Sequence, residues 1–167
     1  VLGFGFGGIG VLAATLHMIY HALIKSALFL SAGTIFIKYS STKIANIRGA
    51  FKALPITSVL FLAGFFAITG TPPFGIFLTK VFILSAGIKT HLLASVIAII
   101  FMVILFIGFF KNATVMVFGD KPSDIQAGEG SIWLVLPPLI LIAVVVCLSF
   151  YIPPFLNILI NNVISYN

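Results

Sequence analysis

The sequence is poor in acidic residues, in cysteine and in charge of either sign. Three of its 167 residues are Asp or Glu, one is Cys, and charged residues make up 7% of the chain. A soluble domain carries about 25% charged residues, so this composition excludes an ordinary soluble fold. The lone Cys147 excludes a metal cluster or a disulfide framework built by this chain alone. We therefore expect no cofactor in this chain, and any redox centre is expected in a partner.

Other common kinds of site are also missing. Phosphate-binding loops, paired carboxylates and nucleophile motifs do not occur, and GFGFGG at residues 3–8 lacks the strand and helix of a nucleotide fingerprint. The net charge of +6 comes from nine scattered basic residues. In a soluble protein such an excess suggests nucleic acid, but here we interpret it as anchoring of loops at a lipid surface. No nucleic-acid partner is expected.

Long apolar runs are what the sequence does have. Hydrophobic residues make up 61% of it and the mean hydropathy is +1.28. Runs of about 20 apolar residues fit α-helices that cross a core about 30 Å thick, whereas the strands of a β-barrel would alternate. We predict an all-α, multi-pass transmembrane bundle forming a single domain over residues 1–167. Its helices are expected at about 13–37, 55–70, 74–88, 92–110 and 132–152, with loops at 38–52 and 112–131.

Three ionisable residues lie at regular spacing within the first predicted helix. His17, His21 and Lys25 are spaced i, i+4, i+8 and share one stripe of the helix. A lysine near the middle of a membrane helix costs roughly 2.5–3.5 kcal/mol, and Lys25 is too far from either end to reach water. An imidazole titrates near neutral pH, so such a row can accept and pass protons. The duller alternatives are an interfacial His17 and a His21 that only bonds a neighbouring helix.

The second unusual feature is a break in an apolar stretch. Gly70, Pro72, Pro73 and Gly75 interrupt it, because consecutive prolines cannot continue a helix. Residues 55–88 then form either two short spans or one discontinuous span, and the break is either an interfacial turn or a feature beside an ion site. Lys80 follows the break, and it either reaches water there or needs a carboxylate or histidine partner. No acid occurs in a predicted span, so carboxylate partners are expected from outside this chain.

Two stretches carry a family resemblance. LHMIYHALIKSALFLSAG and LPITSVLFLAGFFAITGTPPFGIFLTKVFIL resemble the antiporter-like membrane subunits of respiratory complex I, membrane-bound NiFe hydrogenases and Mrp-type cation antiporters. GTPPFGIF and the closing YIPPFLNIL are most similar to hydrogenase-4 component F and its formate hydrogenlyase relatives. That subgroup has a glutamate where this chain has Lys80, and several complex I subunits have lysine there. The chain, which starts with Val1, is expected to be the C-terminal part of a longer protein.

The resemblance implies a fold, a function and partners. The fold would be part of a larger inverted repeat, with an external hairpin at 38–52, and a proton path would use His17, His21, Lys25 and Lys80. The chain would be a non-redox, proton-translocating subunit of an NADH:quinone oxidoreductase-like complex or a group 4 NiFe hydrogenase, in a prokaryotic cytoplasmic membrane. Its partners would be other membrane subunits, peripheral redox subunits and lipid. The alternatives are a structural scaffold role and a place in an Mrp-type Na⁺/H⁺ antiporter.

Overall fold

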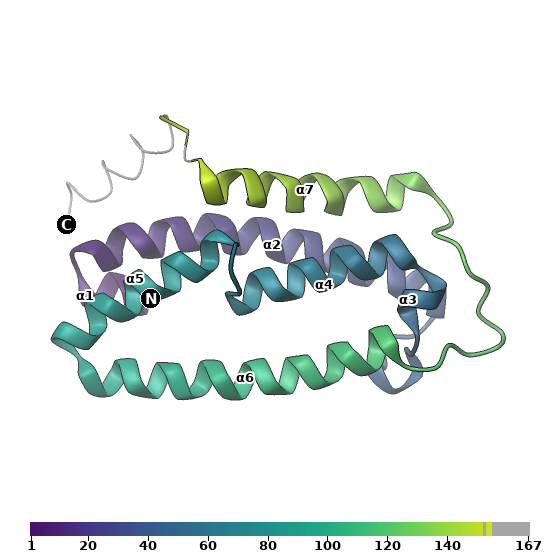
Figure 1. Ribbon diagram of the computed structural model, residues 1–167, viewed down its shortest axis with the longest axis horizontal. Coiled ribbons are helices and arrows are strands. Elements are labelled where there is room, and N and C mark those ends of the chain that lie inside the picture. The colour runs from purple at the N-terminus through teal and green to yellow at the C-terminus, as the bar shows by residue number, and fades with distance from the viewer. Residues whose placement is uncertain (152, 155–167) are drawn as a thin grey trace.

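The computed structural model describes residues 1–151, 153 and 154, so residue 152, the predicted end of the last helix, and most of the YIPPFLNIL motif lie outside it (Figure 1). The described part contains helices and connecting loops and no strand, which confirms the predicted all-α class. The helices are α1 (Leu2–Phe6), α2 (Ile9–Tyr39), the 3₁₀ helix η1 (Ile44–Asn46), α3 (Ala50–Ala53), α4 (Pro55–Thr69), α5 (Gly75–Thr90), α6 (Leu92–Phe118) and α7 (Ile132–Phe150).

The long helix α2 is the centre of the bundle. It packs against α4, α5 and α7, and the core lies where these helices meet. The buried members of this core are Leu16, Tyr20, Ile24, Ala67, Ile76 and Val145. Among the described residues, three helices, α2, α6 and α7, are long and apolar enough to cross a membrane. The chain is therefore an integral membrane protein.

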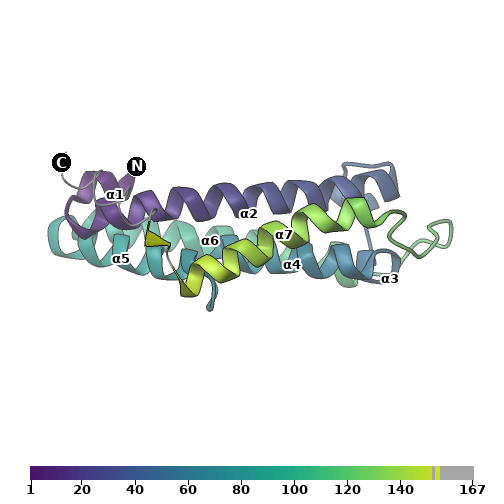
Figure 2. The ribbon, with the colours of Figure 1, turned by 90° about the horizontal axis from the view of Figure 1, so that it is seen from above.

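Helices α4 and α5 lie end to end along the bundle, as both views show (Figures 1 and 2). With 15 and 16 residues they are about 22 and 24 Å long, and each is too short to cross a 30 Å core alone. Together they match the length of about 47 Å of the 31-residue α2. Of the two alternatives for residues 55–88, the structure supports a single discontinuous span.

Helix α6 is longer than predicted and mostly uncovered. It continues to Phe118, so the loop expected at 112–131 begins only at Gly119. The residues between contain no proline or glycine, and Ala113 and Val117, one turn apart, are buried against the bundle. Most other apolar side chains of α6 are exposed, which suits a helix that faces lipid or a neighbouring protein in the membrane.

The loop expected at 38–52 is shorter and more ordered than predicted. Helix α2 extends through Tyr39, and the segment beyond it contains η1 and α3. Residues 38–52 contain no strand, so the segment does not form a β-hairpin in this chain, and its external position stays a prediction. Gly49, with φ at +64°, is the N-cap residue of α3, and Tyr39 donates a hydrogen bond to the carbonyl of Arg48 at 2.7 Å. These contacts fold the segment back against the end of α2.

The loop after α6, which contains the three acidic residues of the chain, covers the start of α4. Glu129 accepts hydrogen bonds from the amides of Ile56 and Thr57, at 2.6 and 3.2 Å, and from the Thr57 hydroxyl. Pro55 occupies the first position of α4, where a missing N–H has no consequence. A carboxylate at a helix N-terminus satisfies free amides and complements the helix dipole. Glu129 is thus the N-terminal cap of α4.

Candidate functional site

The row on α2 keeps its predicted spacing and is not uniformly buried. His17 and His21 are half-buried, and their rings stack with centroids 6.0 Å apart and an angle of 24° between the planes. Lys25 is exposed in this chain, with its ammonium 5.8 Å from the centre of the Phe29 ring. It lies 16 and 14 residues from the ends of α2, roughly 20 Å or more from each, so its side chain cannot reach either end.

A hydrogen bond links this row to α5. His17 Nδ1 lies 2.8 Å from the hydroxyl oxygen of Thr79, a buried residue 62 positions further along the chain. Thr79 immediately precedes Lys80, so the same turn of α5 carries the partner of His17 and the second lysine. His21 has no hydrogen bond to a protein group in the part of the chain that the structure describes. Of the two histidines, His17 is the one that forms a hydrogen bond between α2 and α5.

The break after α4 is a helix end of a familiar kind. Gly70 adopts the left-handed conformation, with φ 82° and ψ 47°. The amide of Gly70 bonds the carbonyl of Ala67 at 3.1 Å, and the amide of Thr71 bonds the carbonyl of Phe66 at 3.0 Å. This is the Schellman arrangement, which satisfies two of the four free carbonyls at a helix C-terminus. The carbonyls of the last two helical residues remain.

Lys80 satisfies both remaining carbonyls. Its ammonium donates hydrogen bonds to the carbonyl oxygens of Ile68 and Thr69, at 3.2 and 2.9 Å. In a continuous helix these oxygens would accept from residues 72 and 73, but Pro72 and Pro73 have no N–H. The negative end of the α4 dipole also favours a cation here. Lys80 therefore has backbone partners of its own, where the sequence suggested water, a carboxylate or a histidine.

The other side of the break is held by α7. The amide of Gly75, the first residue of α5, donates to the Ser149 hydroxyl oxygen at 2.7 Å, and Tyr20 donates to the carbonyl of Leu148 at 2.7 Å. A Cβ on Gly75 would lie 2.5 Å from an atom of the Tyr20 ring. Glycine at this position therefore lets α2 and α5 pack closely. The end of α4 is thus bonded to Lys80, and the start of α5 is bonded to Ser149 of α7.

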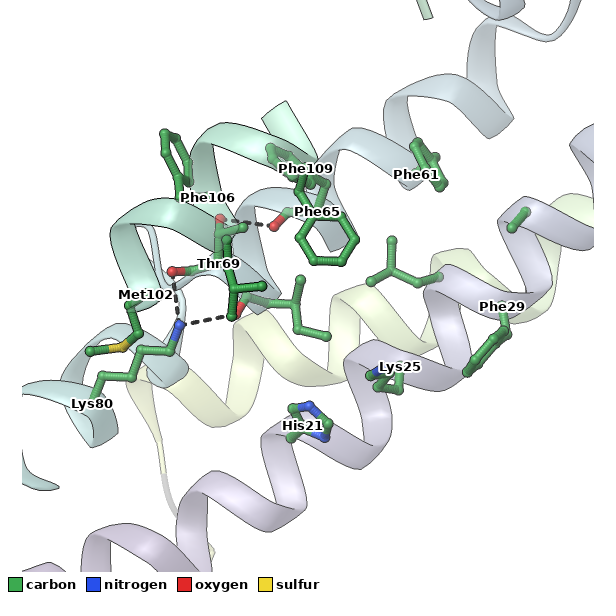
Figure 3. Close-up of a pocket in the computed structure, with 14 residues that line it drawn as sticks. His21, Lys25, Phe29, Phe61, Phe65, Thr69, Lys80, Met102, Phe106 and Phe109 are labelled. Carbon is green, nitrogen blue, oxygen red and sulfur yellow. Dashed lines mark hydrogen bonds between the residues drawn. The ribbon is translucent and has the colours of Figure 1, made fainter. Parts of the chain in front are cut away.

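Two cavities meet at Lys80. The first, of about 420 Å³, lies among α2, α4, α5 and α6 and is lined by His21, Lys25 and Lys80 together with mostly aromatic and aliphatic side chains. Figure 3 shows His21 and Lys25 on α2 facing this space, with the Lys80 ammonium at its far side bonded to the end of α4. The second, of about 480 Å³, is lined by His17 and Lys80. Lys80, Met102 and Leu105 border both cavities.

The arrangement assembles all four residues predicted for a proton path around one helix break. Imidazole and ammonium groups can exchange protons with water held between them. Neither Lys25 nor Lys80 contacts a carboxylate in the described part of the chain, where the ion pair found is Lys52 with Asp120 at 3.8 Å. The origin of carboxylate partners outside this chain stays a prediction.

Sequence reasoning missed two contributions to the site. The carbonyl partners of Lys80 could have been predicted, because prolines at 72 and 73 remove the amides that residues 68 and 69 would otherwise bond. The pairing of Thr79 with His17 had no such signal, since nothing in the sequence fixes how α2 and α5 are rotated against each other. Lys80 itself was identified from its position after the break.

Comparison with known proteins gives consistent results. A family model described as "NADH:quinone oxidoreductase/Mrp antiporter, TM" matches residues 1–108. A Na⁺/H⁺ antiporter protein of Bacillus subtilis is 30% identical over 178 aligned residues, covering 95% of this chain and 20% of that protein. "Hydrogenase-4 component F homolog" of Methylacidiphilum infernorum is 35% identical over 103 residues, covering 59% of this chain and 22% of that protein.

A solved structure shares the fold. One chain of the Mrp complex from Dietzia sp. DQ12-45-1b superposes with a TM-score of 0.80 at 20% identity, over 89% of this chain and 36% of that one. The present chain spans about a fifth of the length of the Bacillus and Methylacidiphilum relatives.

Proposed function

The chain belongs to the NADH:quinone oxidoreductase/Mrp antiporter family of membrane proteins, and on that premise we propose that it carries protons through the membrane by way of Lys25 and Lys80. One observation carries the proposal. His21, Lys25 and Lys80, which come from two helices, line a single cavity beside a helix break. Ionisable groups inside a membrane are rare and face the protein interior or water, where they form proton or ion pathways.

The proposed path runs from the α2 row to the break. A proton enters at His17 and His21, reaches Lys25, and crosses the first cavity through water to Lys80. The carbonyls of Ile68 and Thr69 stabilise Lys80 in its charged form, because hydrogen bonds to an ammonium are stronger than those between neutral groups. Lys80 thus has a defined resting place from which it can accept and release a proton.

Two kinds of complex could use this path. In an oxidoreductase complex of the NADH:quinone oxidoreductase or hydrogenase type, redox chemistry in peripheral subunits would drive the protons. In an Mrp-type complex, protons would exchange for Na⁺ without a redox partner. The alignment favours the second, since the antiporter relative matches 95% of this chain and the hydrogenase relative 59%. In both, other membrane subunits supply the carboxylates, and bacterial relatives support a prokaryotic cytoplasmic membrane.

Replacing each lysine by methionine tests the role in transport. Lys25→Met and Lys80→Met are introduced into the full-length protein in its complete complex, and proton uptake is measured in inverted membrane vesicles. We expect each variant to assemble and to lose at least nine-tenths of the transport, because methionine cannot carry a proton. Lys89→Met is the matched control, since Lys89 lies on the same helix as Lys80 but is exposed near its end.

The outcomes separate the transport role from a structural one. Variants that assemble but do not transport protons exclude a mere scaffold role for the lysines. Full transport in both lysine variants would refute the proposal. A loss of assembled complex in native gels, with normal transport per remaining complex, would indicate structural ion pairs.

The driving reaction is identified in the same vesicles. Proton movement in response to added Na⁺, without any electron donor, is expected if the chain works in an Mrp-type antiporter. Movement that requires an electron donor and acceptor, and is insensitive to Na⁺, would assign the chain to an oxidoreductase complex.

A further inference from the structure

Thr79 is a buried residue that contacts His17 but has no role in the proton path described above. Its side chain is 2% exposed, and its hydroxyl oxygen lies 2.8 Å from His17 Nδ1 and 3.0 Å from the carbonyl oxygen of Ile76. The contact with Thr79 is the hydrogen bond that the His17 ring makes in the part of the chain that the structure describes.

The number of protons at this contact restricts the state of His17. A hydroxyl has one proton to donate, and the Ile76 carbonyl oxygen, which can only accept, lies within hydrogen-bonding distance of the Thr79 hydroxyl, as is common for threonine in a helix. When the Thr79 proton is donated to this carbonyl, the hydroxyl oxygen accepts from His17, and His17 Nδ1 carries the proton in the 2.8 Å contact. A neutral imidazole has a single N–H, so Nε2 keeps its lone pair.

We propose that Thr79 is a positioning residue that holds His17 in the tautomer with its proton on Nδ1, leaving Nε2 as the atom that takes up and releases the transported proton. The inference rests on the proposed function. A proton from water in the second cavity, which His17 lines, forms a new N–H bond at Nε2 and gives an imidazolium. The same bond breaks when the proton moves on, and the Nδ1–H bond to Thr79 persists throughout.

The contact also fixes where this exchange takes place. Because Thr79 precedes Lys80 in α5, the bond from His17 sets the position of the α2 row relative to the second lysine. Without it, the ring can rotate about its side-chain bonds and either nitrogen can carry the proton.

Transport measurements on three variants separate this role from simple packing. Thr79→Val keeps the shape and removes the hydroxyl, whereas Thr79→Ser keeps the hydroxyl and removes a methyl group. In the complete complex in vesicles we expect Thr79→Val to lower proton transport about fivefold, the effect of losing one ordinary hydrogen bond. Thr79→Ser is expected to stay within about twofold of the original protein. If Thr79→Val does not assemble, Thr79→Ala, which adds no apolar branch, takes its place.

A spectroscopic measurement tests the tautomer directly. In the complete complex labelled with ¹⁵N-histidine, solid-state NMR distinguishes the two neutral tautomers, and the His17 signals are those lost in His17→Ala. We expect a proton on Nδ1 in the original protein and in Thr79→Ser, and a mixture of both tautomers in Thr79→Val. A proton on Nε2 in the original protein would overturn the inference.

The two proposals fail in different ways. If Thr79→Val transports normally while Lys25→Met and Lys80→Met do not, the positioning role is wrong and the path stands. If Thr79→Ser is impaired as strongly as Thr79→Val, Thr79 acts by packing, which also overturns the inference. Normal transport in the lysine variants would refute the path itself, whereas the NMR result would still report on the tautomer.

Discussion

Replacing Gly70 by alanine should displace the Lys80 side chain, although Lys80 itself is unchanged. Gly70 has a positive φ of 82°, and a Cβ there would lie 2.9 Å from Lys80 Cδ and 3.2 Å from Nζ. The lysine chain is flexible and can move away from the methyl group. In moving, it would carry the ammonium away from the carbonyls of Ile68 and Thr69, which are 3.2 and 2.9 Å from it.

The expected magnitude has two parts. A non-glycine residue in the left-handed conformation costs roughly 1–2 kcal/mol. Loss of one hydrogen bond from the ammonium costs roughly 1.5–3 kcal/mol more. The first part acts on the stability of the helix end, and the second acts on Lys80. Since about 1.4 kcal/mol corresponds to a factor of ten, we expect Gly70→Ala to reduce proton transport at least about tenfold.

Two control variants isolate the effect on Lys80. Gly130 has φ at 77° and nothing within 4 Å of its hypothetical Cβ, so Gly130→Ala introduces similar backbone strain without a contact. Gly108 lies within α6, also with open space around it, so Gly108→Ala introduces only a methyl group. Proton uptake is measured in vesicles containing the complete complex, and the amount of assembled complex is measured by native gel. Both controls are expected to transport at the original rate.

One result would refute the reasoning about the break. If Gly70→Ala transports protons as fast as Gly130→Ala, the bonds between Lys80 and the end of α4 do not matter for transport. A reduced amount of complex with an unchanged rate per complex would assign Gly70 a role in folding only.

Two further substitutions test what holds the bundle in place. Glu129→Ala removes the cap of α4 and should lower stability by about 1–2 kcal/mol, seen as a lower thermal unfolding midpoint in detergent, with Glu129→Gln intermediate. An unchanged midpoint would contradict the capping role. Gly75→Ala places a methyl against the buried Tyr20 ring, which cannot yield, and should cost about 1–3 kcal/mol or prevent assembly. Gly33→Ala on α2, with open space around it, is the control.

Much of the fold followed from simple patterns in the sequence. Apolar runs of membrane length predicted the helices, and the two prolines at 72 and 73 placed the end of α4 and the start of α5 within one residue. The end of α6 lies at Phe118, beyond the predicted residue 110, and the polar Lys111 and Asn112 are exposed residues inside the helix. Polar side chains on an exposed helix surface do not end a helix, and no glycine or proline follows until Gly119.

The candidate site was predicted in its members but not in its geometry. Side chains that are costly in lipid, such as Lys25 and Lys80, stand out in any apolar sequence. Which cavity a side chain faces depends on the rotation of each helix about its axis, and that is set by packing over the whole bundle. The link between His17 and Thr79 and the cap formed by Glu129 join segments more than 60 residues apart. No local pattern specifies either contact.

The position of Lys80 has an electrical consequence. Its ammonium is attached to the end of α4, at the junction of two half-helices that together make one span, so its charge lies within the voltage drop across the membrane. Moving one charge across the whole membrane changes the energy by about 2.3 kcal/mol per 100 mV. A swing of roughly 5 Å through a 30 Å core therefore changes it by about 0.4 kcal/mol per 100 mV. The membrane potential thus acts on any movement of the Lys80 ammonium across the membrane.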